Sequence, residues 1–291
     1  MAATIRNPIE WGWDQLRQVG QGFRSAGDAA RHMEERLHDT SPAPAIRRIR
    51  ASELPAILRQ ALADFGAYRS DVVFLCLIYP IAGLILARAV YGQDLLPLLF
   101  PIAAGFAILG PMAALGLYEM SRLREQRREV TWTAAFGVLR SPAIGAIALL
   151  GLALVAIFLL WLLAAWLIYA ATLGPEPPAS VAAFVDDLFT TAAGWTLILV
   201  GCGVGFLFAL LAMSISLVSF PLLLDRDVGL DRAVQTSLRV MWANPGPMAL
   251  WGLIVAGLLL LGSIPLLIGL IVVLPVLGHA TWHLYRRVVL R

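Results

Sequence analysis

Residues 143–173 read AIGAIALLGLALVAIFLLWLLAAWLIYAATL, an apolar run without a single charged side chain. A helix needs about 20 apolar residues to cross a hydrocarbon core of about 30 Å. Because this run exceeds that length, it predicts a membrane-spanning helix that tilts, kinks or projects beyond the bilayer.

The composition of the whole chain is that of a membrane protein. Of its 291 residues, 59% are hydrophobic and 14% are charged, and the mean hydropathy is +0.79. Soluble domains carry about 25% charged residues. The two cysteines, Cys76 and Cys202, lie in different apolar runs, which indicates packing rather than a disulfide or a metal site.

Six apolar runs are long enough to cross a bilayer. Only helices or closed barrels satisfy backbone polar groups in lipid, and these runs have the length of helices. We therefore expect an all-α, polytopic protein with six transmembrane helices. The predicted spans are residues 72–91, 95–118, 143–173, 192–224, 247–263 and 265–285.

Positive charge is distributed on one side of this topology. The chain has 22 basic residues, all of them arginine, and every one except Arg88 falls on the side of the N-terminus. Since basic residues concentrate in cytoplasmic segments, both termini are predicted to be cytoplasmic. The net charge of +3 follows from this topology and gives no support for a nucleic-acid partner.

The cytoplasmic segments resemble one another. FGAYRSD at residues 65–71 is echoed by FGVLRSP at 136–142, and a weaker third copy ends in WANP at 242–245. Each copy follows an amphipathic stretch and precedes a membrane entry. The pattern predicts three repeats of a short cytoplasmic amphipathic helix followed by a transmembrane hairpin.

The helices that return to the cytoplasm match as well. Pro111 and Pro275 each lie eleven residues before an arginine, Arg122 and Arg286, while Pro221 precedes the pair Asp225-Arg226. We expect the repeats at about 51–122, 129–226 and 230–287, within a transmembrane domain over 51–291.

The first short helix is amphipathic. Leu54, Leu58, Leu62 and Phe65 recur at helical spacing, and Arg59 and Asp64 are assigned to the opposite side. Such a helix lies either along the inner headgroup layer or against the cytoplasmic ends of the bundle. The pattern leaves both arrangements open.

Residues 1–50 form a separate cytoplasmic segment, predicted as an amphipathic helix followed by a proline-containing linker. The linker ends in a basic cluster, Arg47, Arg48 and Arg50. Such a cluster near a span attracts anionic lipid at about 1 kcal/mol per charge, or it serves only as a topology signal.

Polar residues gather at the predicted cytoplasmic ends of the spans. His279 and His283 lie on one helix face, and repeat symmetry places Glu119 at a similar depth to His283. These three are candidate metal or haem ligands; the alternative is an aromatic belt with its acids paired to arginine. The candidate set, called the rim cluster below, is Glu119, Arg122, Asp225, Arg226, His279, His283 and Arg286.

Three strings carry a resemblance to a known family: LGLYEMSR at 115–122, SFPLLLDRD at 219–227 and LPVLGHATWHLYR at 274–286. Over roughly residues 46–287 the chain resembles the predicted integral membrane proteins of the domain of unknown function 2189 family, found in proteobacteria. The resemblance implies a bacterial inner-membrane location. It transfers no catalytic residue.

We expect a non-enzymatic protein with a structural, lipid-organising or complex-associated role. Its partners would be membrane lipids and another membrane protein complex, with no cofactor. No nucleophile and base recur at catalytic spacing, and no span carries a charge near its centre. The alternatives are a channel or permease for a small or lipidic solute, and a haem- or metal-binding respiratory accessory protein that uses His279, His283 and Glu119.

Overall fold

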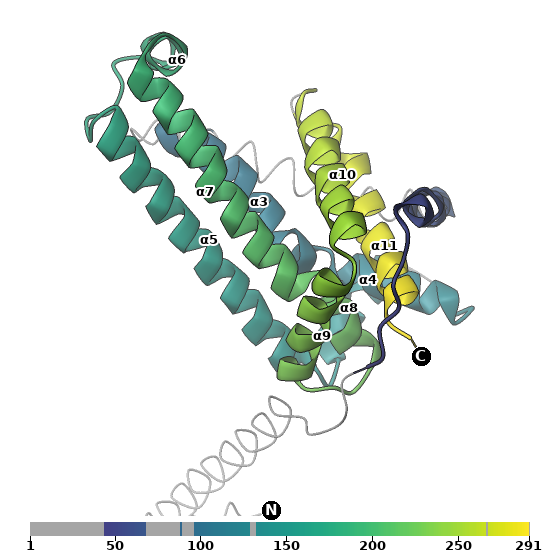
Figure 1. The fold of residues 1–291 in the computed structure, drawn as a ribbon. Helices are drawn as coiled ribbons and strands as arrows, with labels where there is room; N and C mark the ends of the chain where they lie inside the picture. The colour runs from purple at the N-terminus through teal and green to yellow at the C-terminus, as the bar shows by residue number, and fades with distance from the viewer. Residues whose placement is uncertain (1–43, 68–87, 89–95, 129–131, 266, 291) are drawn as a thin grey trace, which may run out of the picture.

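The computed structural model describes residues 44–67, 88, 96–128, 132–265 and 267–290, which are predominantly helical (Figure 1). Within these ranges no strand forms, and a single antiparallel bridge joins Ile46 to Val289. The expectation of an all-α protein is confirmed for this part of the chain. The predicted helix within residues 1–43 lies outside the described residues.

Four described helices are long and apolar enough to cross a membrane, so the chain is an integral membrane protein with several apolar helices. They correspond to the second, third, fourth and fifth predicted spans. The first predicted span, 72–91, lies outside the described residues except for Arg88. The four candidate spans are Leu96–Glu125, Ile144–Thr172, Ala192–Asp225 and Pro245–Ser263.

Three helices pack against one another: α5 (Ile144–Thr172), α3 (Leu99–Ala113) and α7 (Ala192–Ser216) (Figure 1). The short 3-10 helix η2 (Leu96–Leu98) precedes α3, and α6 (Val181–Thr190) joins α5 to α7. Large apolar side chains along α5 and α7 are exposed. This is the surface expected of helices that contact lipid chains.

Two of the candidate spans are interrupted near the same end of the bundle. The helix α7 stops at Ser216 and α8 resumes over Ser219–Asp225. Pro221 explains this break, because its ring lacks an N–H and clashes with the carbonyl of Leu217 four residues earlier. In the other span Pro111 lies inside α3, three residues before Ala114 separates α3 from α4 (Leu115–Glu125).

The last hairpin differs from the prediction in its turn. The helix α10 (Pro245–Ser263) is followed by turns, in which Leu267 has a φ of 67°, and α11 spans Leu270–Val288. The sixth helix therefore does not begin at residue 265, because the backbone there is turned. Among the described helices, α11 is not one that is long and apolar enough to cross a membrane, so the sixth span stays a prediction.

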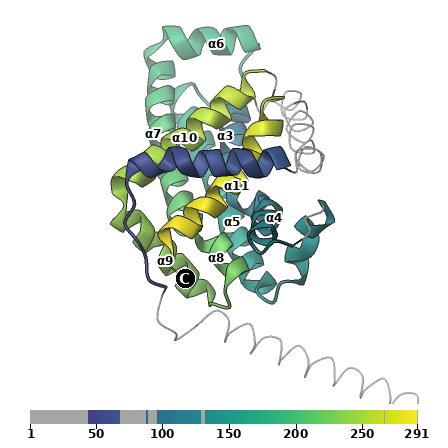
Figure 2. The ribbon, with the colours of Figure 1, turned by 90° about the vertical axis from the view of Figure 1, so that its right-hand side faces the viewer.

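The short predicted helices differ from one another. Residues 54–67 form an α-helix that runs across α11 in Figure 2, and Leu54, Ile57 and Ala61 on its inner face are fully buried. Of the two arrangements that the sequence left open, the buried face of this helix therefore shows docking on the bundle. A 3-10 turn at Ala51–Glu53 (η1) precedes it.

The second short element, Trp132–Arg140 (η3), is a 3-10 helix rather than an α-helix, whereas the third, α9 (Leu230–Ala243), is α-helical. The threefold repeat is therefore only partly visible in the secondary structure and stays a prediction.

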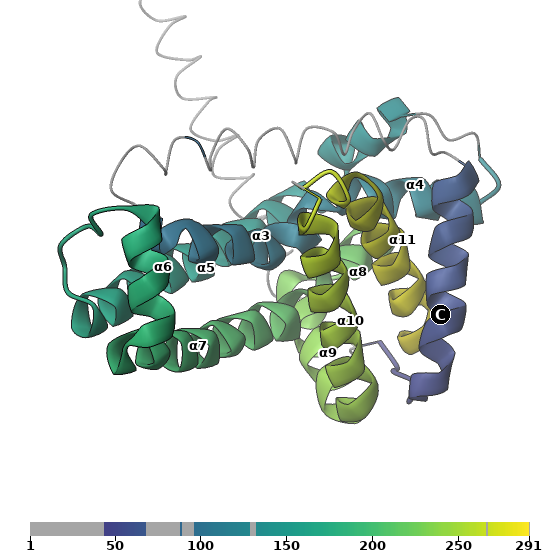
Figure 3. The same ribbon diagram turned by 90° about the horizontal axis from the view of Figure 1, so that it is seen from above.

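The helices α4, α8 and α11 form a buried core, in which each of them contacts the other two. Figure 3 shows α4, α8 and α11 beside α9 and α10 at one side of the molecule. The largest fully buried side chains of the described residues come from α4, α8 and α11 and from α10: Trp251, Trp282, Tyr118, Tyr285 and Phe220. This packing fixes the helix ends that carry the rim cluster.

Candidate functional site

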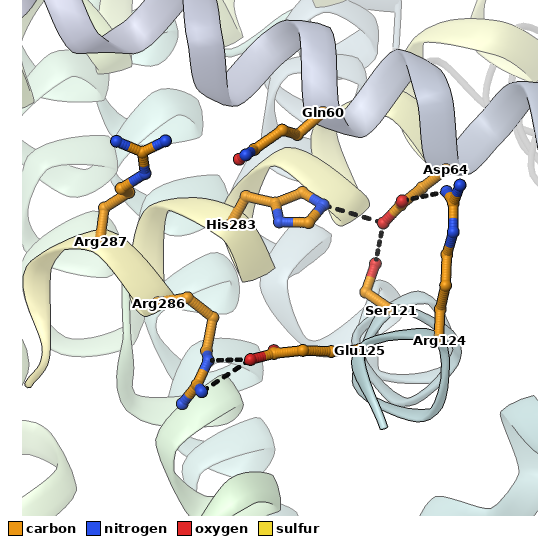
Figure 4. A pocket seen from close by; sticks show the side chains of 8 residues that line it. All are labelled: Gln60, Asp64, Ser121, Arg124, Glu125, His283, Arg286 and Arg287. Carbon is orange, nitrogen blue, oxygen red and sulfur yellow. Dashed lines mark hydrogen bonds and ion pairs between the residues drawn. The ribbon is translucent and has the colours of Figure 1, made fainter. Parts of the chain in front are cut away.

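Asp64 joins three helices through one buried carboxylate, which is 6% exposed. Its Oδ2 atom accepts a hydrogen bond of 2.8 Å from the Ser121 hydroxyl and lies 2.9 Å from Nε2 of His283. Its Oδ1 atom forms an ion pair with Arg124. Figure 4 shows these side chains converging from the helix at 54–67, α4 and α11.

The Ser121 hydroxyl extends this network to His279, whose Nδ1 atom lies 2.7 Å from the Ser121 oxygen. A hydroxyl has one hydrogen to donate. Since Ser121 gives it to the ionised carboxylate of Asp64, Nδ1 of His279 must be the donor to Ser121. The backbone of Leu117 lies near this ring. The buried Nε2 atom of His279 nevertheless makes no hydrogen bond of normal geometry among the described residues.

Asp64 is ionised at neutral pH. Burial by itself would raise the pKa of its carboxyl group, but the hydrogen bond and charge of His283, together with the hydrogen bond from Ser121, bring the pKa below the ordinary value of 3.8. A buried charge with these partners is stabilised by several directed hydrogen bonds. The helix at 54–67 is thereby fixed to α4 and α11.

Asp225 forms a second junction, between α8 and α11. Its Oδ2 atom accepts hydrogen bonds from the Tyr285 hydroxyl at 2.7 Å and from Arg286 at 3.1 Å. The same guanidinium donates to Glu125 of α4 at 2.8 Å and 3.2 Å. Arg286 therefore connects the ends of three helices.

The remaining carboxylate of the rim cluster, Glu119, is bound within its own helix. Both of its oxygens accept from Arg122, at 2.8 Å and 2.9 Å. This is the bidentate geometry that makes arginine–carboxylate pairs strong. Arg122 is only partly buried, so its outer edge reaches the surface.

Two open polar pockets, of about 410 Å³ and 640 Å³, lie side by side at these helix ends. They share Glu125 and Arg286, whose ion pair forms the wall between them. The smaller pocket (Figure 4) is lined by Gln60, Asp64, Ser121, Arg124, Glu125, His283, Arg286 and Arg287. The larger is lined by Arg122, Glu125, Gln126, Asp225, Arg226 and Arg286.

The structure brings most of the rim cluster to these pockets. Arg122, Asp225, Arg226 and Arg286 line the larger pocket and His283 lines the smaller one. The other two members, Glu119 and His279, lie behind the lining and are bound to Arg122 and Ser121.

Sequence reasoning missed Asp64 as a site residue and assigned it to the polar side of its helix. The signal was its spacing: Asp64 lies three residues after Ala61 and seven after Ile57, so it continues the buried face. Ser121, Arg124 and Glu125 were also missed. They lie in the same helical turns as the predicted Arg122 but on other faces. The pattern of one sequence does not show which of these faces lines a pocket.

The candidate metal ligands have other partners in this structure. His283 is bound to Asp64, His279 to Ser121 and Glu119 to Arg122. Across the described part of the chain, no group of three or more His, Cys, Asp or Glu side chains is close enough to hold a metal ion.

The basic cluster before the first short helix is exposed. Arg47 forms an ion pair of 2.7 Å with Glu53, and Arg48 and Arg50 also face solvent. Their backbone is held on the bundle: Ile49 donates to the buried Asn244 side chain at 2.7 Å. The cluster is therefore presented at a fixed place beside the C-terminal end of α11.

The apolar helices define an integral membrane protein. Residues 99–225 match the sequence model of the domain of unknown function 2189 family, described as a predicted integral membrane protein. The resemblance is confirmed over this segment, which extends from α3 through α8. No curated protein and no solved structure matches the chain.

Proposed function

We propose that this is a non-enzymatic protein of the bacterial inner membrane that binds anionic phospholipid headgroups at its cytoplasmic rim. One observation carries the proposal. Arg122, Arg226 and Arg286 end three different helices and line one pocket of about 640 Å³, beside the ends of apolar spans.

The proposed topology places this pocket at the cytoplasmic membrane surface. With α11 and residues 72–91 as two further spans, six crossings put both termini and all three pocket arginines on the side where basic residues concentrate. The anionic lipids of that leaflet attract such segments.

The guanidinium N–H groups of the pockets favour a phosphate-bearing ligand. Together their linings carry five arginines and three carboxylates. Glu119 and Glu53 lie behind them and balance Arg122 and Arg287. These ion pairs do not use all the N–H groups of the arginines. A guanidinium has five N–H groups, and Arg122 gives two of them to Glu119.

Arg226 provides the cleanest test of lipid binding. Its Nε atom is 3.9 Å from Asp225, and it donates to the backbone of Leu290, so its loss breaks no short buried ion pair. Titrating delipidated protein with phosphatidylglycerol or cardiolipin, and with phosphatidylcholine as comparison, should give tighter binding of the anionic lipids. Arg226→Gln should weaken that binding about fivefold, which corresponds to about 1 kcal/mol.

Arg128→Gln is the matched control, since Arg128 is exposed and does not line either pocket. Equal affinity of the wild-type protein for anionic and zwitterionic lipid would overturn the proposal. So would an Arg226→Gln variant that binds as tightly as Arg128→Gln.

A further inference from the structure

The helix α6 (Val181–Thr190) presents an exposed apolar stripe at the end of the molecule opposite the rim pockets (Figure 1). Val181, Val185 and Phe189 recur every four residues, and their exposed fractions are 39%, 45% and 57%. At about 100° per residue these three side chains lie within about 80° of one another. They form one continuous face.

A different face of α6 holds it to the bundle. Phe184 packs edge-on against Tyr169 of α5, with ring centroids 6.3 Å apart, and α6 contacts α7. The Ser180 hydroxyl caps the first turn by accepting from the Ala183 N–H at 3.1 Å. The exposed stripe is therefore presented by a well-anchored helix.

The helix runs across the ends of α5 and α7 rather than along them (Figures 1 and 2). Its junction with α7 is tight: a Cβ atom at Gly194 would lie 2.2 Å from the carbonyl oxygen of Asp187. Only a glycine permits this approach, so the angle between α6 and α7 is fixed by backbone contact.

The apolar stripe continues onto the surface of a candidate span. Phe189 packs edge-on against Trp195 of α7, with centroids 6.4 Å apart, and the Trp195 indole N–H donates to the Phe189 carbonyl at 3.1 Å. Trp195 is 50% exposed, and Leu199 one turn further is 68% exposed. The stripe and the lipid-facing side of α7 thus form one surface.

The polar residues of α6 lie on other faces. Measured from Val185, the middle residue of the stripe, Asp186 lies about 100° away, Thr190 about 140° and Asp187 about 160°; all three are exposed. An amphipathic helix in a membrane interface has this arrangement, with apolar side chains among the acyl chains and polar ones in water. Tryptophan at the end of a span is also typical of that depth.

We infer that α6 is an interfacial helix that lies in the headgroup layer of the leaflet opposite the rim pockets, with Val181, Val185 and Phe189 inserted among lipid chains. The occupant of the stripe is the lipid surface itself. This inference is independent of headgroup binding at the rim pockets, because it depends on the α5–α7 end of the molecule alone.

Spin-label accessibility in proteoliposomes tests the inference. In a background with Cys76 and Cys202 replaced by alanine, single cysteines are placed at Val185 and Phe189 on the stripe, and at Asp186 and Thr190 on the polar faces. Each label is exposed to oxygen, which concentrates in lipid, and to a water-soluble nickel chelate. The ratio of oxygen to nickel collisions should be several-fold higher at 185 and 189 than at 186 and 190.

Two results would overturn the inference. Equal nickel access at all four positions would place the stripe in water. Low access of both reagents at 185 and 189, with high access at 186 and 190, would show that a protein surface covers the stripe. Preserved helicity of each labelled variant by circular dichroism ensures that the comparison concerns a folded protein.

Discussion

At the scale of single residues, Asp64 decides whether the helix at 54–67 stays on the bundle. Its carboxylate receives hydrogen bonds from Ser121 and His283 and pairs with Arg124. All three partners donate, so a neutral amide in its place would present an N–H group to at least one of them. The interactions cannot be rebuilt by a residue of the same size.

Asp64→Asn should lower the free energy of unfolding by about 2 kcal/mol, since Arg124 is partly exposed and its share of the interaction is reduced by solvent. Arg59→Gln on the exposed face of the same helix is the control and should change stability little. Thermal unfolding in detergent measures both variants. Equal unfolding temperatures for the two would contradict the assigned role of Asp64.

The stabilisation from Asp64 should also depend on pH. Because folding lowers the pKa of this carboxyl group below 3.8, its contribution is complete above pH 3.8 and is lost as the pH falls through the lower pKa of the folded state. The stability difference between wild-type protein and Asp64→Asn should therefore shrink below pH 3.8. A difference that stays constant through that range would show that the carboxylate charge is not the source.

At the scale of elements, prolines determine where helices break, and glycines determine where two segments approach each other closely. Pro221 and Pro111, which the sequence analysis compared by their spacing from arginine, lie within a few residues of the breaks between α7 and α8 and between α3 and α4. Two glycines of α7, Gly201 and Gly205, differ in their surroundings. Only Gly205 is packed, against the Trp161 ring, while nothing lies within 4 Å of a Cβ at Gly201.

Gly194→Ala should disturb the corner between α6 and α7. The added Cβ would lie 2.2 Å and 2.4 Å from the carbonyl oxygens of Asp187 and Leu188, so the backbone must move, at a cost of about 2 kcal/mol. Thermal unfolding measures this loss, and faster proteolysis within 174–191 would locate it. Gly201→Ala on the same helix is the control; the corner is not strained if both variants are equally stable.

Some elements could not be predicted from the sequence because their form depends on distant contacts. The segment 132–140 has a helical pattern but folds as a 3-10 helix against α4. The helix α6 is not among the predicted helices, because it is short and the Tyr169 ring that holds it belongs to another helix. The spacing of Asp64 from Ile57 and Ala61 shows its face, but its partners Ser121, Arg124 and His283 lie far away in the chain and could not be predicted.

At the scale of the whole molecule, the convergence of Arg122, Arg226 and Arg286 on one pocket accords with the spacing of proline and arginine in the sequence. The structure has an arginine near the C-terminal end of each of α4, α8 and α11. The sequence pattern included Glu119 and Asp225, which pair with Arg122 and Arg286, but not Glu125, which holds Arg286 from another helix. The resulting surface combines arginines held by ion pairs with the ends of apolar spans.

Native mass spectrometry of the protein extracted from bacterial membranes in mild detergent tests the central claim most directly. The wild-type protein and Arg128→Gln should retain bound anionic phospholipid, whereas Arg226→Gln should retain markedly less. An Arg226→Gln variant with the same bound lipids as the wild-type protein, or a wild-type protein without preference for anionic lipid, would contradict the account.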